Sequence, residues 1–390
     1  MRWIDNYIGK PICYLLELYA WTKQLFSKEK EKPIKKILFT KYLGIGSIVQ
    51  ATPLIRSVKQ DYPEAKIIFL TFYDNKDLIK PLCLIDEVLC VRNDNFLVFL
   101  SDVLSSLYHL KKEKLDIVLN LEFFSKFGAI ISFLSGARIT VGYYLKEPWR
   151  THLITHKVYY NHYKHISEVF MALGGAIGTV STNLSLIRPN INQDDRQFIQ
   201  QTFEHHGITS SHWKVVVNVN SSRLSLNRCW SLSNFTSLID RMVRTYEAKI
   251  ILIGGKSDIP RVGEVIASLN NNQNIVNLAG KTNIMQLLAL LESVDFVITN
   301  DSGPLHLAVM MEVPTISFFG PESPIQFGPR GSQHTVLYKG YYCSPCLHVY
   351  NEKSSTCEDN ICLKDISVDE VFEVVTHYYR EWEQISNEKN

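Results

Sequence analysis

Short apolar runs rich in β-branched and aromatic residues alternate with amphipathic stretches along most of the chain. Such runs predict buried strands, and apolar residues at helical spacing predict the helices between them. In the first half, strands are predicted at residues 36–40, 66–71, 87–92, 116–121 and 138–142. Helices are predicted at residues 48–60, 97–111, 125–134 and 166–172. Strands that alternate with helices are typical of a parallel sheet covered on both faces.

The alternation resumes after a break. Residues 174–178 are rich in glycine and residues 181–192 are largely polar, which indicates a boundary between two domains. Further strands are predicted at residues 214–219, 249–253 and 296–299, with another ahead of Gly320. Further helices are predicted at residues 232–244, 259–269, 284–291 and 304–311. The segment 151–160 is interpreted as a loop that leads into the helix at 166–172.

This pattern divides the chain into four parts. Residues 1–30 form an amphipathic N-terminal prefix, 35–185 a first Rossmann-like domain, 190–366 a second, and 367–390 a C-terminal helix and tail. We expect the last helix to pack back onto the first domain. In the prefix, the apolar residues are interrupted near Gly9 and Pro11, and the unbroken part is too short to span a bilayer. The prefix can therefore lie on a membrane surface or pack on the protein's own body.

Composition narrows the class of protein. With 46% hydrophobic and 21% charged residues, the chain has an ordinary globular composition, and its 390 residues can build two substantial cores. The net charge of +2 argues against a bulk nucleic-acid footprint. Asp5, Lys10 and Glu17 interrupt the N-terminal apolar residues, so no secretory signal is expected and a cytoplasmic location is favoured.

The strongest candidate for chemistry is a strand, turn and helix at residues 296–311. The turn Asn300-Asp301-Ser302-Gly303 precedes the helix, where unpaired N–H groups and the helix dipole favour an anion such as a diphosphate. His306 follows Ser302 by about one helical turn and can face the same ligand. The alternative is that Asp301 only caps the helix and His306 packs in a core. A second glycine turn, residues 319–324, follows the next strand, and two such loops at one sheet edge make a ligand crevice.

The same residues carry a resemblance. The pattern T-N-D-S-G-P-x-H-L-A-x-x-x-x-V-P-T-x-x-x-F-G-P, from Thr299 to Pro321, resembles the signature of glycosyltransferase family 9, the heptosyltransferase-like enzymes of lipopolysaccharide core assembly. The segment KYLGIGSIVQATPLIRSVKQDYPEAKI looks like the opening of that family. The resemblance covers about residues 36–366. It implies an α/β fold of the GT-B type, in which two Rossmann-like domains face each other across a cleft, the first on the acceptor side and the second binding the nucleotide-sugar.

The resemblance also implies a reaction. It is the inverting, metal-independent transfer of a heptose or similar sugar from a nucleotide-diphosphate donor, with ADP-heptose favoured, to a lipopolysaccharide core or related lipid-linked saccharide. No cofactor is required, and such an acceptor would suit a peripheral location on the inner membrane. Two alternatives stay open. The chain can be a catalytically inactive nucleotide-sugar-binding module, or another nucleotide-sugar enzyme on this scaffold, such as an epimerase.

Donor-binding residues are carried over from the matching motifs. The stretch around Arg228 resembles the family's phosphate-contacting segment, and a guanidinium offers a planar fork to phosphate oxygens. The alternative is a solvated surface arginine. The full set of expected donor-binding residues is Lys41, Asn220, Arg228, Asp301, Ser302, Gly303 and His306.

The catalytic base is the point where the chain departs from the family. Most members have an aspartate, thought to be the base, at the position of Ser47, and a serine hydroxyl accepts a proton only when another group activates it. Glu122 follows the strand at 116–121 and is our hypothesis for a substitute base. Its alternative role is a helix-start carboxylate that complements the helix dipole.

Four cysteines gather near the end of the second domain. Cys343 and Cys346 form a C-x2-C pair, and Cys357 and Cys362 form a C-x4-C pair. This spacing can build a tetrahedral zinc site of structural type. Buried thiols or an incidental disulfide are the alternatives.

Overall fold

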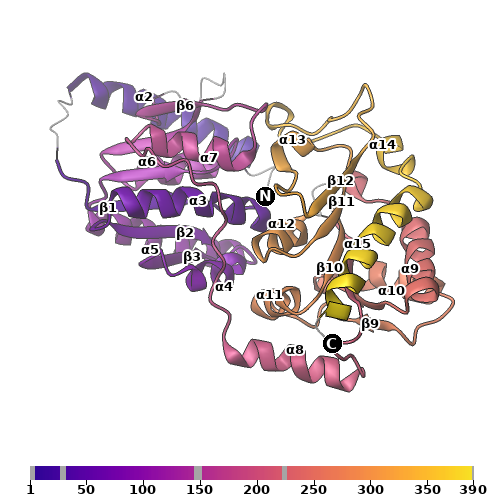
Figure 1. Ribbon diagram of the computed structural model, residues 1–390. Coiled ribbons are helices and arrows are strands. Elements are labelled where there is room, and N and C mark those ends of the chain that lie inside the picture. Colours follow the sequence, from indigo (N-terminus) through magenta and orange to yellow (C-terminus); the bar gives the residue numbers. More distant parts are fainter. Residues whose placement is uncertain (1–4, 27–31, 145–151, 222–225, 389–390) are drawn as a thin grey trace. The chain divides into compact units, whose positions relative to one another are not determined.

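The protein folds into two compact units, Met1–Asn190 and Ile191–Asn390. The computed structural model describes residues 5–26, 32–144, 152–221 and 226–388. Each unit is built around one six-stranded sheet with helices on its faces (Figure 1). The predicted prefix is described from Asp5 to Phe26, as a π-helical turn η1 (Asp5–Gly9) followed by α2 (Lys10–Phe26).

The first unit has a parallel sheet in the order β3-β2-β1-β4-β5-β6. The strand order reverses beside β1, because β2 lies on one side of it and β4 on the other. In such sheets, ligands bind at the carboxyl ends of the strands where the order reverses. The strands are β1 (Lys36–Thr40), β2 (Lys66–Phe72), β3 (Glu87–Val91), β4 (Ile117–Asn120), β5 (Ile139–Tyr144) and β6 (His156–Tyr159).

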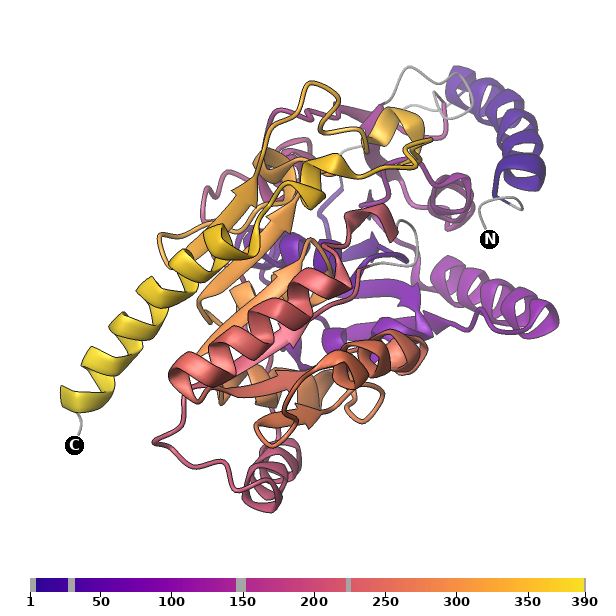
Figure 2. The same ribbon diagram turned by 90° about the vertical axis from the view of Figure 1, so that its right-hand side faces the viewer.

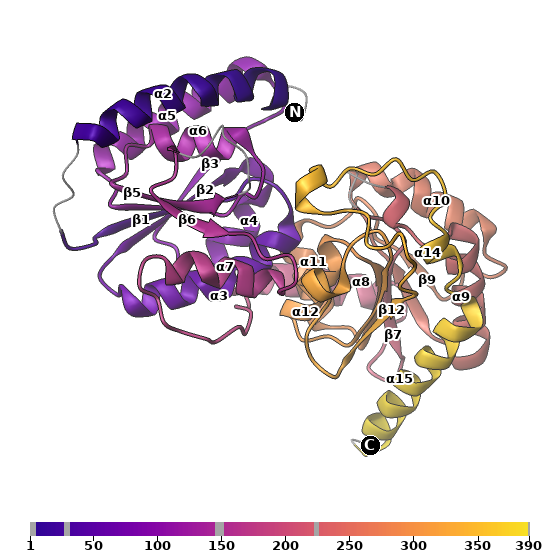
Figure 3. The same cartoon turned by 90° about the horizontal axis from the view of Figure 1, so that it is seen from above.

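Helices cover both faces of this sheet. Figure 3 shows α2, α5 and α6 on one face and α3 and α7 on the other. Their bounds are α3 (Ile45–Asp61), α4 (Lys76–Ile79), α5 (Phe96–Glu113), α6 (Lys126–Leu134) and α7 (Ile166–Gly175). Helix α2 packs on α6 through a small cluster that contains Cys13, Ala20 and Ala129. Of the two alternatives for the prefix, this contact shows that one side of α2 packs on the protein's own body. Of the helices among the described residues, none is both long and apolar enough to cross a membrane.

The second unit repeats the plan in the order β12-β11-β10-β7-β8-β9, and β10 lies between β7 and β11. Its strands are β7 (Lys214–Asn218), β8 (Lys249–Leu252), β9 (Ile275–Asn277), β10 (Phe296–Asn300), β11 (Thr315–Phe319) and β12 (His334–Tyr338). Its α-helices are α8 (Gln193–His205), α9 (Leu232–Tyr246), α10 (Ile259–Ser268), α11 (Ile284–Glu292), α12 (Gly303–Met310), α13 (Pro324–Phe327), α14 (Ile361–Lys364) and α15 (Val368–Glu388).

Two sequence predictions are corrected here. The segment expected to be a loop contains β6, which pairs parallel with β5 at the sheet edge. Its residues alternate between half-buried and exposed, so no apolar run marks it. The last helix, α15, packs on the second unit, where Val371, Phe372 and Val375 join the core beneath the sheet. Figure 2 shows α15 beside α9. An amphipathic helix has an apolar stripe, but the stripe does not say which surface it covers.

Candidate functional site

Buried polar groups form a hydrogen-bond network at the carboxyl ends of β7 and β10. The Asn218 amide at the end of β7 donates to the hydroxyl of Thr299 at 3.0 Å and to that of Ser302 at 2.9 Å. Asn300 at the end of β10 accepts from the Trp230 backbone N–H at 2.8 Å. Its amide donates to the Asn220 carbonyl at 3.2 Å. These bonds tie the end of β10 and the turn before α12 to two segments of the second unit, residues 218–220 and Trp230, so the turn is held in one conformation.

The start of α12 has no side-chain cap. Ser302 precedes the helix, but its hydroxyl faces Asn218 and Thr299, so it does not cap the first N–H groups. Asp301 does not cap the helix either, because its carboxylate pairs with Arg228. Gly303 is half-buried. The positive end of the α12 dipole and the Gly303 N–H can therefore receive a negatively charged group.

Arg228 is held beside this helix start. It ends the 3₁₀ turn η5 (Leu226–Arg228), and its Nη2 lies 2.5 Å from Asp301 Oδ2 and 2.7 Å from the Asp301 carbonyl oxygen. The Arg228 side chain is 14% exposed, so the solvated-surface alternative does not describe it. Its Nε is buried and has no hydrogen-bond partner among the described residues. A buried guanidinium N–H without a partner is costly, and a phosphate oxygen would satisfy it.

His306 is a neutral group in this cluster. It lies in α12 with 5% of its surface exposed. Burial lowers the pKa of His306 to about 4; the Arg228 and Lys353 cations act in the same direction, and the Asp301 carboxylate opposes them. At neutral pH the imidazole therefore carries no charge, and it can offer a hydrogen bond but not a cation.

The sequence analysis missed a second buried ion pair. Glu322, in the glycine turn after β11, is 1% exposed, and its Oε2 lies 2.7 Å from Lys353 Nζ. Burial raises the pKa of Glu322, against the pull of Lys353, and its Oε1 has no partner among the described residues. Glu322 and Arg228 are close enough to shift each other's pKa. The position of Glu322 after a strand of the same sheet edge was the available signal.

Asn220 belongs to the same network rather than to the surface. Its amide donates to the Ile253 carbonyl at 3.2 Å, which links the end of β7 to the end of β8. Its Oδ1 is buried without a partner among the described residues. The second unit thus gathers most of the expected donor-binding residues at one sheet edge: Asn220, Arg228, Asp301, Ser302, Gly303 and His306.

The remaining candidates for catalysis and donor binding, Lys41, Ser47 and Glu122, lie in the first unit, near the ends of β1 and β4. Glu122 Oε1 accepts from the backbone N–H groups of Tyr42 at 2.7 Å and Leu43 at 3.2 Å, and it lies 3.1 Å from Lys41 Nζ. Both charged side chains are buried. The carboxylate thus holds the turn between β1 and α3, and it does not serve the start of α6, which Ser125 caps. One oxygen of Glu122 is already engaged by three donors.

Ser47 lies in the first turn of α3 and is half-buried. Gly44, with φ of 85°, makes the turn into this helix, and a Cβ added there would lie 3.3 Å from Ser47 Oγ. Among the residues that the structure describes, none forms a hydrogen bond with the Ser47 hydroxyl. No carboxylate or imidazole of those residues is therefore hydrogen-bonded to this serine to activate it.

The four cysteines of the predicted zinc site lie in the segment that follows β12. Their thiols are free, with Cys362 buried and Cys343 exposed. Burial raises the pKa of Cys362 to about 11, and the other three thiols add to the shift. The backbone N–H groups of Cys346 and Leu347 donate to the Pro321 carbonyl, which ties this segment to the glycine turn of Glu322. The zinc site stays a prediction.

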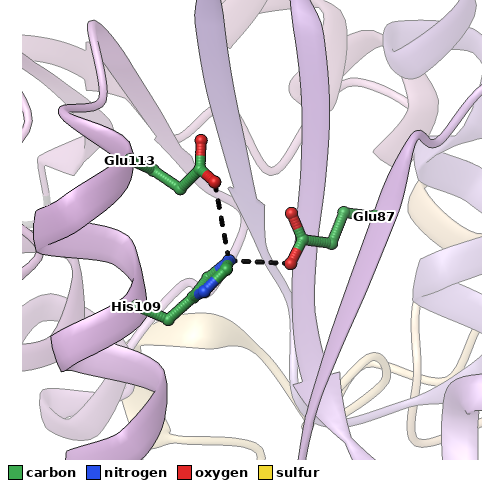
Figure 4. A group of neighbouring side chains, drawn as sticks. All are labelled: Glu87, His109 and Glu113. Atoms are coloured by element: carbon green, nitrogen blue, oxygen red, sulfur yellow. Dashed lines mark ion pairs between the residues drawn. The ribbon is translucent and has the colours of Figure 1, made fainter.

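One other cluster has the donor types of a metal site. Among the described residues, Glu87, His109 and Glu113 are the group whose ligand atoms lie within 4.8 Å of one another (Figure 4). Lys66 Nζ lies 2.7 Å from Glu87 and 3.1 Å from Glu113, and Lys36 Nζ lies 2.7 Å from Glu113. The lysines already supply the positive charge that a metal would bring. The cluster lies where β1, β2 and β3 begin, so we interpret it as a structural ion network.

We expect the Glu113→Gln variant to have a lower free energy of unfolding at neutral pH, and the difference from the unaltered protein should shrink in acid. Hydrogen bonds from Lys36 and Lys66 hold the pKa of Glu113 at about 2, below its ordinary 4.5. Because the folded-state pKa is depressed, the contribution is present above about pH 4.5 and is lost as the pH falls towards 2. Urea unfolding should show a loss of about 1 kcal/mol at pH 7 and a weaker pH dependence in this window.

The matched control is Glu64→Gln, which changes an exposed glutamate of the same unit. It should leave the unfolding midpoint and its pH dependence as in the unaltered protein. An equal effect of the two substitutions would contradict the network.

Comparison with known proteins agrees with this architecture. The family model of glycosyltransferase family 9 (heptosyltransferase) matches residues 104–356. A relative named lipopolysaccharide heptosyltransferase 3 from Escherichia coli is 24% identical over 317 residues, which cover 76% of this chain and 87% of that protein.

Two solved structures have the same fold. A family 9 glycosyl transferase from Veillonella parvula superposes with a TM-score of 0.75 and 22% identity, over 91% of this chain and all of that one. The ADP-heptose lipopolysaccharide heptosyltransferase II of E. coli superposes with a TM-score of 0.71 and 18% identity, over 90% of this chain and all of that one. The predicted α/β fold of the GT-B type, with two Rossmann-like units, is confirmed.

Proposed function

The chain belongs to glycosyltransferase family 9, and from this we propose that it transfers a heptose from ADP-heptose to a lipopolysaccharide core or a related lipid-linked saccharide. The observation that carries the donor half of the proposal is Arg228, which is fixed beside the uncapped start of α12 and has a buried N–H without a partner among the described residues. The names of the matched relatives support the sugar, the nucleotide and the acceptor class. We place the reaction in the cytoplasm at the inner membrane, because such an acceptor is lipid-anchored.

The second unit would hold the donor diphosphate. As the bond between the sugar and the diphosphate breaks, negative charge grows on the leaving phosphate oxygens. The Gly303 N–H, the α12 dipole and the guanidinium of Arg228 are preorganised to stabilise that charge. Asp301 keeps the guanidinium in place, and neutral His306 adds a hydrogen-bonding group without another charge. These groups need no metal ion for the leaving charge, so we propose metal-independent transfer.

Inversion at the anomeric carbon is the proposed outcome. In a single displacement, the acceptor oxygen bonds to the anomeric carbon on the face opposite the departing diphosphate, and a base takes the hydroxyl proton. Glu122 is the proposed base. Its three donors also support a different role, in which it positions the turn at Tyr42 and Leu43. The inactive binding module remains the second candidate function, because Ser47 lacks an activating partner among the described residues.

The Arg228→Ala variant tests the phosphate role. We expect ADP binding, measured by titration calorimetry, to weaken by about 1.5 to 3 kcal/mol, because a charge-assisted contact is lost. The matched control is Arg241→Ala, which removes a surface pair with Asp369 in the same unit.

The Arg228→Ala substitution leaves the Asp301 carboxylate buried and without its ion-pair partner. The double variant Arg228→Ala/Asp301→Ala therefore separates an effect on folding from an effect on ADP binding. It should regain thermal stability relative to Arg228→Ala while ADP affinity stays low. Unchanged ADP affinity in Arg228→Ala, or its recovery in the double variant, would refute the phosphate role.

Variants of Glu122 and Ser47 test the base. With ADP-heptose, an acceptor saccharide and EDTA present, the unaltered protein should transfer heptose. Glu122→Gln should lower kcat by at least about a hundredfold, with the low-pH limb of the kcat profile removed, whereas Ser47→Ala should change kcat little. A lower kcat with an unchanged pH profile would make Glu122 a positioning residue. Turnover that appears only in Ser47→Asp would favour the inactive module.

A further inference from the structure

Between residues 11 and 22, the outward face of α2 is apolar and uncharged. Its exposed side chains between residues 11 and 22 include no charged group, and Leu15, Leu18 and Trp21 are 72%, 64% and 49% exposed. The one carboxylate of α2, Glu17, is turned inward and accepts from the backbone N–H and Nδ1 of His152. A surface helix of a soluble protein normally shows the reverse, with charges outward and apolar residues inward. The outward face is therefore not built for contact with bulk water.

A second apolar stripe lies on the same face of the first sheet. Helix α5, like α2, covers that face (Figure 3). Leu97, Leu100, Leu104 and Tyr108 follow one another at intervals of three or four residues, so they form one line along the helix. Their exposed fractions run from 42% to 74%. Contiguous exposed apolar residues on this scale mark an interaction surface.

Lysines flank these two apolar stripes. Lys111 and Lys112, at the end of α5, are exposed, and Lys112 Nζ lies 4.3 Å from the centre of the Tyr108 ring. Lys10 is exposed at the start of α2. Two nearby carboxylates are already paired, Asp102 with Arg92 and Glu113 with Lys36 and Lys66, and Asp94 is exposed just ahead of α5. Lysines that flank apolar and aromatic residues complement anionic lipid headgroups.

We propose that these two helices form a membrane-docking surface for a bilayer that contains anionic lipids. The α2/α5 surface consists of Ile12, Leu15, Leu18, Trp21, Leu97, Leu100, Leu104 and Tyr108. It would lie in the plane of the headgroups, with the leucines at the acyl boundary and the aromatic rings and lysines at headgroup level. The proposal rests on the proposed function only for its purpose, which is to bring the enzyme to a lipid-linked acceptor.

Co-sedimentation with vesicles tests the surface. The full chain should bind vesicles of phosphatidylcholine mixed with phosphatidylglycerol, bind weakly to phosphatidylcholine alone, and release as salt is raised. The triple variants Leu15→Ser/Leu18→Ser/Trp21→Ser and Leu97→Ser/Leu100→Ser/Leu104→Ser should each lower binding by at least about tenfold. The matched control replaces exposed apolar residues elsewhere, Val180→Ser/Ile259→Ser/Ile385→Ser, and should bind as the unaltered chain does.

A transfer assay separates this inference from the proposed function. With a lipid-free acceptor saccharide the surface variants should keep their kcat/KM, and with an acceptor embedded in vesicles they should lose most of it. No transfer by any variant, with vesicle binding as described, would refute the proposed function and leave the surface intact. No vesicle binding by the unaltered chain would overturn the surface. The surface would also be overturned if the triple variants altered the molar mass of the protein in light scattering but left vesicle binding unchanged, because it would then be a protein interface.

Discussion

The conformation of the turn before α12 depends on the amide side chain of Asn218. Asn218, at the end of β7, donates to both Thr299 and Ser302 across the neighbouring strand β10. Because this draws the Ser302 hydroxyl inward, the first N–H groups of α12 lose the cap that a serine at this position normally provides. Asp301 is then free to pair with Arg228 instead of with the helix. The helix start is therefore uncapped, and the pair of Arg228 with Asp301 fixes a guanidinium beside it.

The first unit has a similar contact between neighbouring strands, but there the side chain that makes it is charged. Glu122 reaches from the end of β4 to the turn after β1, as Asn218 reaches from β7 to the turn after β10. In both units the two strands are sheet neighbours, so a short polar side chain can span the gap. A buried carboxylate must be compensated, and Lys41 supplies that charge, whereas the neutral amide needs no counter-ion. The pairing explains why Lys41 and Glu122 are buried together.

The charges of the donor-side cluster balance before any ligand arrives. Arg228 and Asp301 form one buried pair, and Lys353 and Glu322 form another. Balanced pairs allow two cations to be buried at modest cost. Among the described residues, Arg228 Nε, Asn220 Oδ1 and Glu322 Oε1 are buried polar atoms without partners, and they mark where hydrogen bonds are still missing. The site is thus held in place before a ligand supplies the missing hydrogen bonds. Such preorganisation is the condition for electrostatic stabilisation of a growing charge.

Local periodicity was enough to predict β1, β7 and the turn before α12, because a buried strand is apolar along its whole length and the turn has its own residue signature. It was not enough for β6, an edge strand that lacks an apolar run, or for the surface that α15 covers. The residue types also marked Arg228, Asp301 and Glu122 as candidates. Only the tertiary structure decided what they bind, since Arg228 meets Asp301 across 73 residues and Glu122 meets Tyr42 across 80. Sequence records which groups can ionise or donate, whereas partners so distant along the chain are chosen by the order of strands in the sheet.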